Sequence, residues 1–304
     1  MLLLAAVAAG WLARRARLPA VLGYLAVGLA VSPFTPGYVA DRQQLHLLAD
    51  VGVVLLLFEV GIEINPLRLA RERGGVLWAA PAQVFLTTIL AGSLALMAGI
   101  GIAGAALIGL SVAMSSSVVV INITRSRRRT TNGPTEEALL SWSVLQDMTG
   151  VAVALLVLAA FVAGLSVGES PAAAEARRRI LPFRDLFAVL FFVSLGSLID
   201  PAAVPGALPW IVFLVAAVVV AKALPVYMLG RLARLPDVRP GQLAIGLGQV
   251  GEFSFVLATI VVGRALIPPE LYTALLATVV LTIVASTVLM RMRPLRTKRS
   301  RIPA

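Results

Sequence analysis

The chain has 304 residues, of which 59% are hydrophobic and 13% are charged. Soluble domains contain about 45–50% apolar and about 25% charged residues, so this composition excludes an ordinary soluble protein and favours one that spans a lipid bilayer. The net charge of +11 does not indicate a nucleic-acid partner, because the arginines occupy short segments between apolar runs. With no cysteine and the single histidine His46, the sequence excludes disulfides and cysteine or histidine zinc sites, and we expect no cofactor.

Apolar runs separated by proline, glycine and charged residues predict about ten transmembrane helices. We therefore expect an all-α polytopic membrane protein, formed by one transmembrane domain over residues 1–304 without a soluble domain. In chain order the predicted helices lie near residues 1–14, 18–33, 43–63, 75–98, 101–123, 137–165, 183–199, 207–230, 241–263 and 269–291.

The distribution of arginines predicts the topology. Basic segments follow the first, third and fifth predicted helices, and neutral segments follow the second and fourth. Because cytoplasmic loops are rich in arginine and lysine, the N-terminus is expected outside and the basic tail 291–301 in the cytoplasm. Counting from the two ends assigns opposite sides to the stretch between Asp147 and Phe183, so an odd number of crossings is missing there. Either residues 137–165 form a bent or re-entrant element, or helices present in related proteins are absent.

Asp147 and Lys222 each lie deep inside an apolar segment. Ionisable groups in such segments cost about 2.5–3.5 kcal/mol on membrane insertion, so each of them needs a reason. Asp147 lies about nine residues into its predicted helix, near the middle of the bilayer, and Lys222 is too deep for its amine to reach the surface easily. A carboxylate and an amine at matching depth predict a site that exchanges a proton for a cation. The alternative is a structural ion pair that joins two helices.

Two of the predicted helices contain polar or small residues that break helices at membrane depth. Non-helical backbone is tolerated there only where it lines a cavity or is buried in protein, and interrupted helices in both halves of a chain indicate a transport site. Small residues also favour close helix packing, which is the alternative explanation for either segment alone. The residues concerned are Ser115, Ser116 and Ser117 in the first half, and Gly246, Gly248, Gln249, Gly251 and Glu252 in the second.

Two further acidic residues, Glu59 and Glu63, share one face of the predicted third helix because they are four residues apart. Glu63 lies near the cytoplasmic end and is expected to be solvated or to cap the helix. Glu59 lies one turn deeper, and it either contributes to the ion path or pairs with an arginine of a loop.

Eight segments, in order along the chain, resemble the monovalent cation:proton antiporter-2 family, which includes glutathione-gated potassium efflux systems and bacterial sodium/proton exchangers. They are LPAVLGYLAVGLAVSP, ADVGVVLLLFEVGIEINP, GLSVAMSSSVVV, LLSWSVLQDMTGVAVALLVLA, FVAGLSVGESP, PFRDLFAVLFFVSLGSLIDP, the span around Lys222, and GLGQVGEFSFVLA.

The resemblance implies a fold of about thirteen helices in two inverted repeats, with a core domain that rocks against a dimerisation domain. It implies that two discontinuous helices cross at Ser115–Ser117 and Gly248–Glu252, in the cell (inner) membrane, in a homodimer. Asp147 matches the ion-binding aspartate of the family and Lys222 its partner lysine. Gln146 matches a position that is a second acid in electrogenic members, and a Gln–Asp pair resembles the potassium-efflux branch, with one proton per cation.

The chain differs from the family between residues 155–160 and 161–171, which follow each other directly here, whereas two helices and most of a third separate them in relatives. The antiporter fold is therefore expected to be shortened in the middle, with first-half helices in 1–165 and second-half helices in 166–304. The favoured function is exchange of Na⁺ or K⁺ for H⁺ by alternating access at Asp147. The alternatives are a non-transporting shortened paralogue or scaffold and a passive channel, and an enzyme is disfavoured.

Overall fold

The structure is a computed structural model that describes residues 1–16, 18–35, 51, 74–124, 131–154, 173–197, 199–251, 253–255, 257 and 266–292. Regular structure in these residues is entirely helical, as the composition predicts. A 3₁₀ turn leads into α11, and a π-helical segment joins α11 to α12. The helices are α1 (Leu2–Arg15), α2 (Ala20–Ala30), α5 (Gly74–Met97), α6 (Ile102–Ala113), α7 (Ser117–Thr124), α8 (Gly133–Ala154), α10 (Ala173–Ser197), α11 (Val204–Ala217), α12 (Leu224–Leu232), α13 (Pro240–Leu247) and α15 (Pro269–Met292).

Most predicted helices are present close to their expected bounds, because long apolar runs bounded by proline and glycine leave few alternatives. The helix expected at 101–123 is divided into α6 and α7 by three non-helical residues. The helix expected at 43–63 lies outside the described residues except for Val51, as does the end of the one expected at 137–165.

The start of α10 differs from the expectation, since the helix begins at Ala173 and not near residue 183. The arginine run 177–179, interpreted from the sequence as a loop, forms part of the first turns of this helix. Alanine has the highest helix propensity, and Glu175 accepts a hydrogen bond from Arg179 one turn later, at 2.8 Å. Local propensity therefore extends the helix beyond its apolar part.

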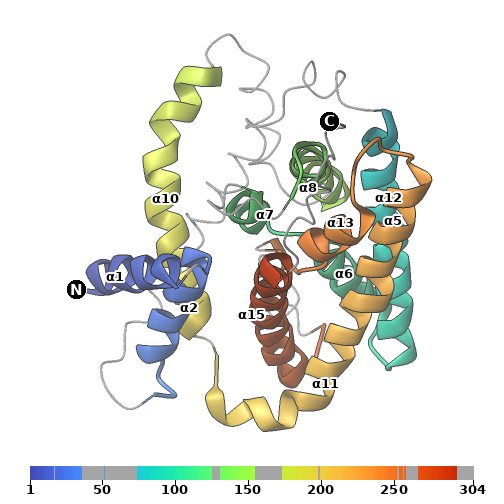
Figure 1. Cartoon of the computed structure of the whole chain (residues 1–304). Coiled ribbons are helices and arrows are strands. Elements are labelled where there is room, and N and C mark those ends of the chain that lie inside the picture. The colour runs from blue at the N-terminus through green and yellow to red at the C-terminus, as the bar shows by residue number, and fades with distance from the viewer. Residues whose placement is uncertain are drawn as a thin grey trace.

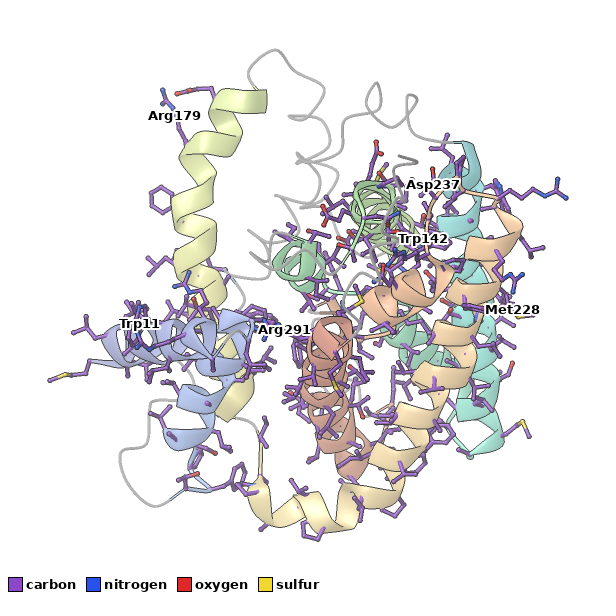
Figure 2. All side chains as sticks on the ribbon, in the orientation of Figure 1. Trp11, Trp142, Arg179, Met228, Asp237 and Arg291 are labelled. Carbon is purple, nitrogen blue, oxygen red and sulfur yellow. The ribbon has the colours of Figure 1, made fainter. Side chains whose placement is uncertain are left out.

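The helices form two groups (Figure 1). In one group, α2 packs against both α1 and α10. In the other, α5 packs against α6 and α8, α11 packs against α15, and α13 packs against α12, α8 and α15. Trp142 on α8 is fully buried within this second group, whereas Trp11 and Met228 are exposed on the outside (Figure 2).

The backbones of α2 and α10 touch where two glycines meet. A Cβ atom added at Gly28 would lie 2.1 Å from the carbonyl oxygen of Val193, and one added at Gly196 would lie 2.2 Å from that of Leu25. Small residues permit such close approach, which is how helices associate where lipid offers no hydrophobic driving force.

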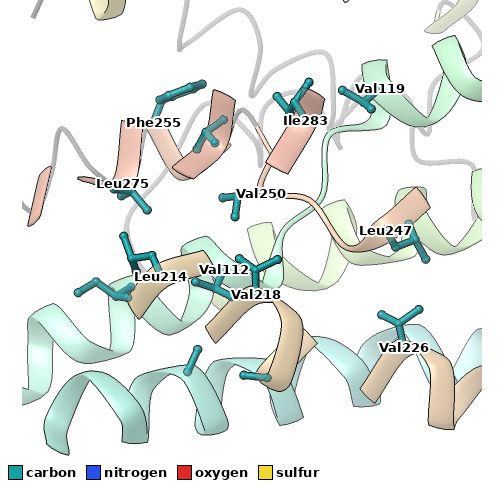
Figure 3. Packing of buried hydrophobic residues seen from close by; sticks show 14 of the residues in the cluster. Val112, Val119, Leu214, Val218, Val226, Leu247, Val250, Phe255, Leu275 and Ile283 are labelled. Atoms are coloured by element: carbon teal, nitrogen blue, oxygen red, sulfur yellow. The ribbon is translucent and has the colours of Figure 1, made fainter. Parts of the chain in front are cut away.

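Three helical segments of the described chain are long and apolar enough to cross a membrane, namely Gly74–Met97, Pro201–Leu232 and Glu270–Met292. Only 28% of the most apolar window of the second is buried against protein, which leaves the larger part of its surface for lipid. Apolar side chains from α6, α7, α11, α13 and α15 fill the interior between these segments (Figure 3). This interior surrounds the two interrupted helices.

Candidate ion-binding site

Two interrupted helices cross at the centre of the second group. Helix α6 ends at Ala113, residues 114–116 are non-helical with Met114 extended, and α7 starts at Ser117. Helix α13 ends at Leu247, and residues 248–251 are non-helical before helical structure returns at 253. Both interruptions lie in the segments where the sequence predicts them, but Ser117 is already the first residue of α7 and Gly246 is still part of α13.

Backbone and hydroxyl groups of the two interruptions satisfy each other. The N–H of Gly251 donates to the carbonyl of Met114 at 2.9 Å. The hydroxyl of Ser115 donates to the carbonyl of Leu247 at 2.8 Å. Because the ends of helices leave carbonyl and N–H groups without intrahelical partners, and the membrane offers no water to replace them, these bonds make the interruptions tolerable.

The side chain of Gln249 acts as a clamp across the crossing. Its Oε1 accepts from the N–H of Ser116 at 3.2 Å, and its Nε2 donates to the carbonyl of the same residue at 3.2 Å. An amide is suited to this pair of hydrogen bonds because it carries one acceptor and one donor side by side. Gln249 and Ser116 are almost completely buried.

Gly251 is required at the crossing because of space. A Cβ atom at this position would lie 2.5 Å from the carbonyl carbon of Ser115 and 2.7 Å from the nitrogen of Ser116. Both are backbone atoms and cannot move aside as a side chain would. The two non-helical segments can therefore approach this closely only where one of them lacks a side chain.

Lys222 lies in the π-helical segment Val218–Ala223, which widens an otherwise continuous helix. Pro225 follows three residues later and has no N–H to donate to the carbonyl of Ala221, which accounts for a local change in the helical bonding. Such π-bulges occur frequently at functional sites. Val219 in this segment is 57% exposed, whereas Lys222 is 0% exposed, so the lysine points into the protein.

The ammonium group of Lys222 joins the two interruptions. Its Nζ donates to the carbonyl of Met114 at 2.7 Å and to the carbonyl of Gln249 at 2.6 Å. These carbonyls follow the C-terminal ends of α6 and α13, where the helix dipole is negative and a cation is stabilised. Sequence reasoning anticipated a carboxylate as the partner of Lys222 but not these two carbonyls.

Asp147 lies on α8, with 7% of its surface exposed, and is close enough to Lys222 to attract the ammonium electrostatically. The carboxylate and the amine therefore interact electrostatically. The hydrogen bonds of Lys222 that the structure shows go to backbone carbonyls. The preceding residue, Gln146, is 0% exposed.

Gln83 of α5 was missed by sequence reasoning. It is fully buried, and its Oε1 accepts a hydrogen bond from Nε2 of Gln146. Its own Nε2 donates to the hydroxyl of Thr87 at 2.9 Å and to the carbonyl of Ala113 at 3.4 Å. The sequence contains a pattern that could have identified Gln83, since a glutamine and a threonine four residues apart lie on one face of an otherwise apolar helix.

Two hydroxyl groups of α15 support the second interruption and were also missed. Thr282 accepts a hydrogen bond from the N–H of Val250 at 3.1 Å. Ser286, one turn further along, donates to the carbonyl of Ile245 at 2.7 Å. The four-residue spacing of these side chains is a readable signal, because it places both on one face of the helix.

The predicted site residues are therefore largely brought together. Ser117 starts α7 beside the crossing, and Gly248 ends α13 there. Glu59 and Glu252 lie outside the described residues. The described part of the chain contains no group of three or more acidic, histidine or cysteine residues that could hold a metal ion.

The chain resembles known proteins in its family profile and in its fold. Residues 2–158 and 154–292 match the profile of the family described as sodium/hydrogen exchanger, transmembrane. The fold is similar to that of the sodium proton antiporter MjNhaP1 from Methanocaldococcus jannaschii, with a TM-score of 0.71 and 16% identity over 96% of each chain. Because the family matches cover most of the chain, this protein belongs to the transmembrane sodium/hydrogen exchanger family and is a multi-pass membrane protein of cation/proton exchange, a transporter and not an enzyme.

Proposed function

We propose that this protein exchanges sodium or potassium ions for protons across the cell membrane, and that both ions bind in turn at Asp147. The observation that carries the proposal is the position of this carboxylate. It is nearly buried on α8 and lies within electrostatic range of the lysine that joins the two interrupted helices. A buried carboxylate is unfavourable unless its charge is compensated. The ammonium of Lys222 supplies part of that compensation while it also donates to two carbonyls, and a bound proton or monovalent cation would complete it.

Competition for one carboxylate couples the two ions. When Asp147 binds a proton it has no charge with which to hold a cation, and when it binds a cation the proton must leave. Gln146 matches the position that is a second acid in electrogenic members of the antiporter family that the sequence resembles. Here it is an amide and carries no charge. We therefore propose one proton per cation and no net movement of charge. Exchange whose equilibrium point shifts with the membrane voltage would contradict this stoichiometry.

Alternating access requires a part of the protein that moves, and we propose that the two interrupted helices belong to it. We propose that the first half, 1–165, and the second half, 166–304, each contribute one of them to a midplane site that opens alternately to either side. Lys222 would hold the crossing together in both states. We further propose that the C-terminus is cytoplasmic, as the basic tail suggests, and that the protein forms a homodimer.

The test is exchange in reconstituted vesicles with an acidic lumen and a pH-sensitive dye. Addition of Na⁺ or K⁺ to wild-type protein is expected to release luminal protons, and the ion that does so is the substrate. Asp147→Asn keeps the shape of the side chain but removes its charge, and it is expected to abolish the release. Cation flux that is not accompanied by proton movement in the opposite direction, in wild type or variant, would indicate a passive channel and contradict the proposal.

A second candidate function is that of a non-transporting, shortened membrane protein. One observation favours it, namely that the family profile matches in two stretches that meet at residues 154–158. This is the place where the sequence predicts a missing central segment. The vesicle experiment separates the two functions, because well-folded wild-type protein that responds to neither ion would have kept the site and lost the transport cycle.

A further inference from the structure

We infer that Gln83 of α5 is a positioning residue for cation binding, because it orients the side-chain amide of Gln146 so that its oxygen is available as a cation ligand. The inference rests on the proposed function and adds to it a residue on a different helix. It is carried by a short chain of hydrogen bonds that starts at the first helix interruption.

The chain of hydrogen bonds starts at the carbonyl of Ala113. This residue is the last of α6, so its carbonyl has no partner within the helix. A carbonyl can only accept, and therefore it fixes which end of the Gln83 amide faces it. Nε2 of Gln83 donates to this carbonyl at 3.4 Å and also to the hydroxyl of Thr87 at 2.9 Å. The hydroxyl can donate or accept, so the carbonyl decides the orientation.

The orientation is passed on to α8. With its Nε2 on the Ala113 carbonyl, Gln83 presents its Oε1 to Gln146, and an oxygen there requires a donor opposite it. Nε2 of Gln146 is that donor. The Oε1 of Gln146 consequently points away from Gln83, and this buried oxygen has no hydrogen-bond partner. A buried acceptor without a donor is unfavourable as long as no cation is bound. A cation that bound there would give this oxygen a partner, as expected of a cation ligand.

The position of this oxygen defines what it can bind. Gln146 precedes Asp147 on α8, so its amide lies at the same depth as the proposed binding carboxylate. An amide oxygen coordinates Na⁺ or K⁺, but it does not take the proton that Asp147 carries. Gln83 is therefore expected to influence the affinity for the cation while leaving proton binding unchanged.

The test uses Gln83→Leu, which keeps most of the volume but removes both ends of the amide. Its matched control is Thr88→Val on the same helix, where the hydroxyl is buried without a partner. The apparent KM for the cation is measured in the vesicle assay at several pH values. We expect Gln83→Leu to raise this KM about tenfold at every pH with an unchanged maximal rate. Thr88→Val should behave as wild type.

The pH dependence separates positioning from general damage. If proton and cation compete at Asp147, a change in cation affinity alone shifts the plot of log KM against pH upward without changing its slope or midpoint. An unchanged KM, or a midpoint that moves together with KM, would overturn the inference. Should Gln83→Leu fail to fold, Gln83→Met gives the same removal with an unbranched chain. A thermal shift with Na⁺ or K⁺ in detergent then reports cation affinity without transport.

The controls also separate this inference from the proposed function. Absence of exchange by wild-type protein, or exchange that survives Asp147→Asn, would sink the proposed function. Exchange that requires Asp147 but shows the same apparent KM for the cation in Gln83→Leu as in Thr88→Val would leave the proposed function intact. It would contradict only the role of Gln83.

Discussion

The contact between α2 and α10 and the crossing of the interrupted helices solve the same problem, close approach of backbones inside a membrane, by different means. At the first contact Gly28 and Gly196 allow regular helices to touch, and both helices run through the contact without a break. At the crossing the helices are broken, and their free carbonyl and N–H groups are satisfied by Lys222, Gln249 and Ser115. Regular helices need only space, whereas broken ones need polar partners.

This difference predicts where stability and function are linked. Polar groups at the crossing are buried and depend on one another, so loss of one leaves others unsatisfied. Substitutions there should affect folding and exchange together. Substitutions in the contact between α2 and α10 should affect folding alone, since no residue of the proposed ion site lies in it.

The largest effect is expected for Lys222→Met. The variant keeps the length of the side chain but removes the ammonium that donates to the carbonyls of Met114 and Gln249 and attracts the carboxylate of Asp147. The carbonyl of Met114 keeps only the N–H of Gly251 as a donor. Removing one partner of a buried charged pair costs about 3–5 kcal/mol, so the free energy of unfolding in mixed micelles should fall by about this amount. Exchange should be lost as well. A variant as stable as wild type would show that Lys222 does not hold the crossing.

A smaller effect is expected for Gly28→Leu in the α2–α10 contact. The new side chain would meet the carbonyl of Val193 and the backbone of Gly196, so the helices must separate. Overpacking of this kind costs about 1–3 kcal/mol of unfolding free energy. The apparent KM for the cation in vesicles should stay at the wild-type value. A raised KM with unchanged stability would contradict the division between the two regions.

The smallest effect is expected for Thr282→Val on α15. This change keeps the shape of the side chain and removes the acceptor for the N–H of Val250 at the second interruption. The lost hydrogen bond from Val250 costs about 1 kcal/mol, the bond that the Thr282 hydroxyl donates to the carbonyl of Val279 in its own helix is lost too, and hydrogen exchange at Val250 should become faster. Thr287→Val, which removes a buried hydroxyl without a partner, is the matched control and should leave that exchange rate unchanged.

The sequence predicted those features that depend on local pattern. Apolar runs defined α5 and α15, and polar residues at membrane depth located both interruptions together with Asp147 and Lys222. The carbonyl partners of Lys222 could not be predicted, because they exist only once two segments more than a hundred residues apart along the chain cross.

Other features were missed for more specific reasons. Gln83 was overlooked because a neutral amide in an apolar span draws less notice than a charge, and its role depends on the turn of α6 that faces it. The early start of α10 was missed because a run of arginines was interpreted as a loop, although alanines around it favour a helix. Periodicity and charge thus predict elements, but they do not predict how side chains bridge them.

The most direct test of the account is to measure protons released when the purified protein binds its cation. Wild-type protein in weakly buffered detergent solution is titrated with Na⁺ and, separately, with K⁺, while the pH is recorded. Competition at Asp147 predicts release of about one proton per protein on saturation with the transported ion, and none from Asp147→Asn. Cation binding by wild type without proton release, or equal release from the variant, would contradict the claim that both ions share this carboxylate.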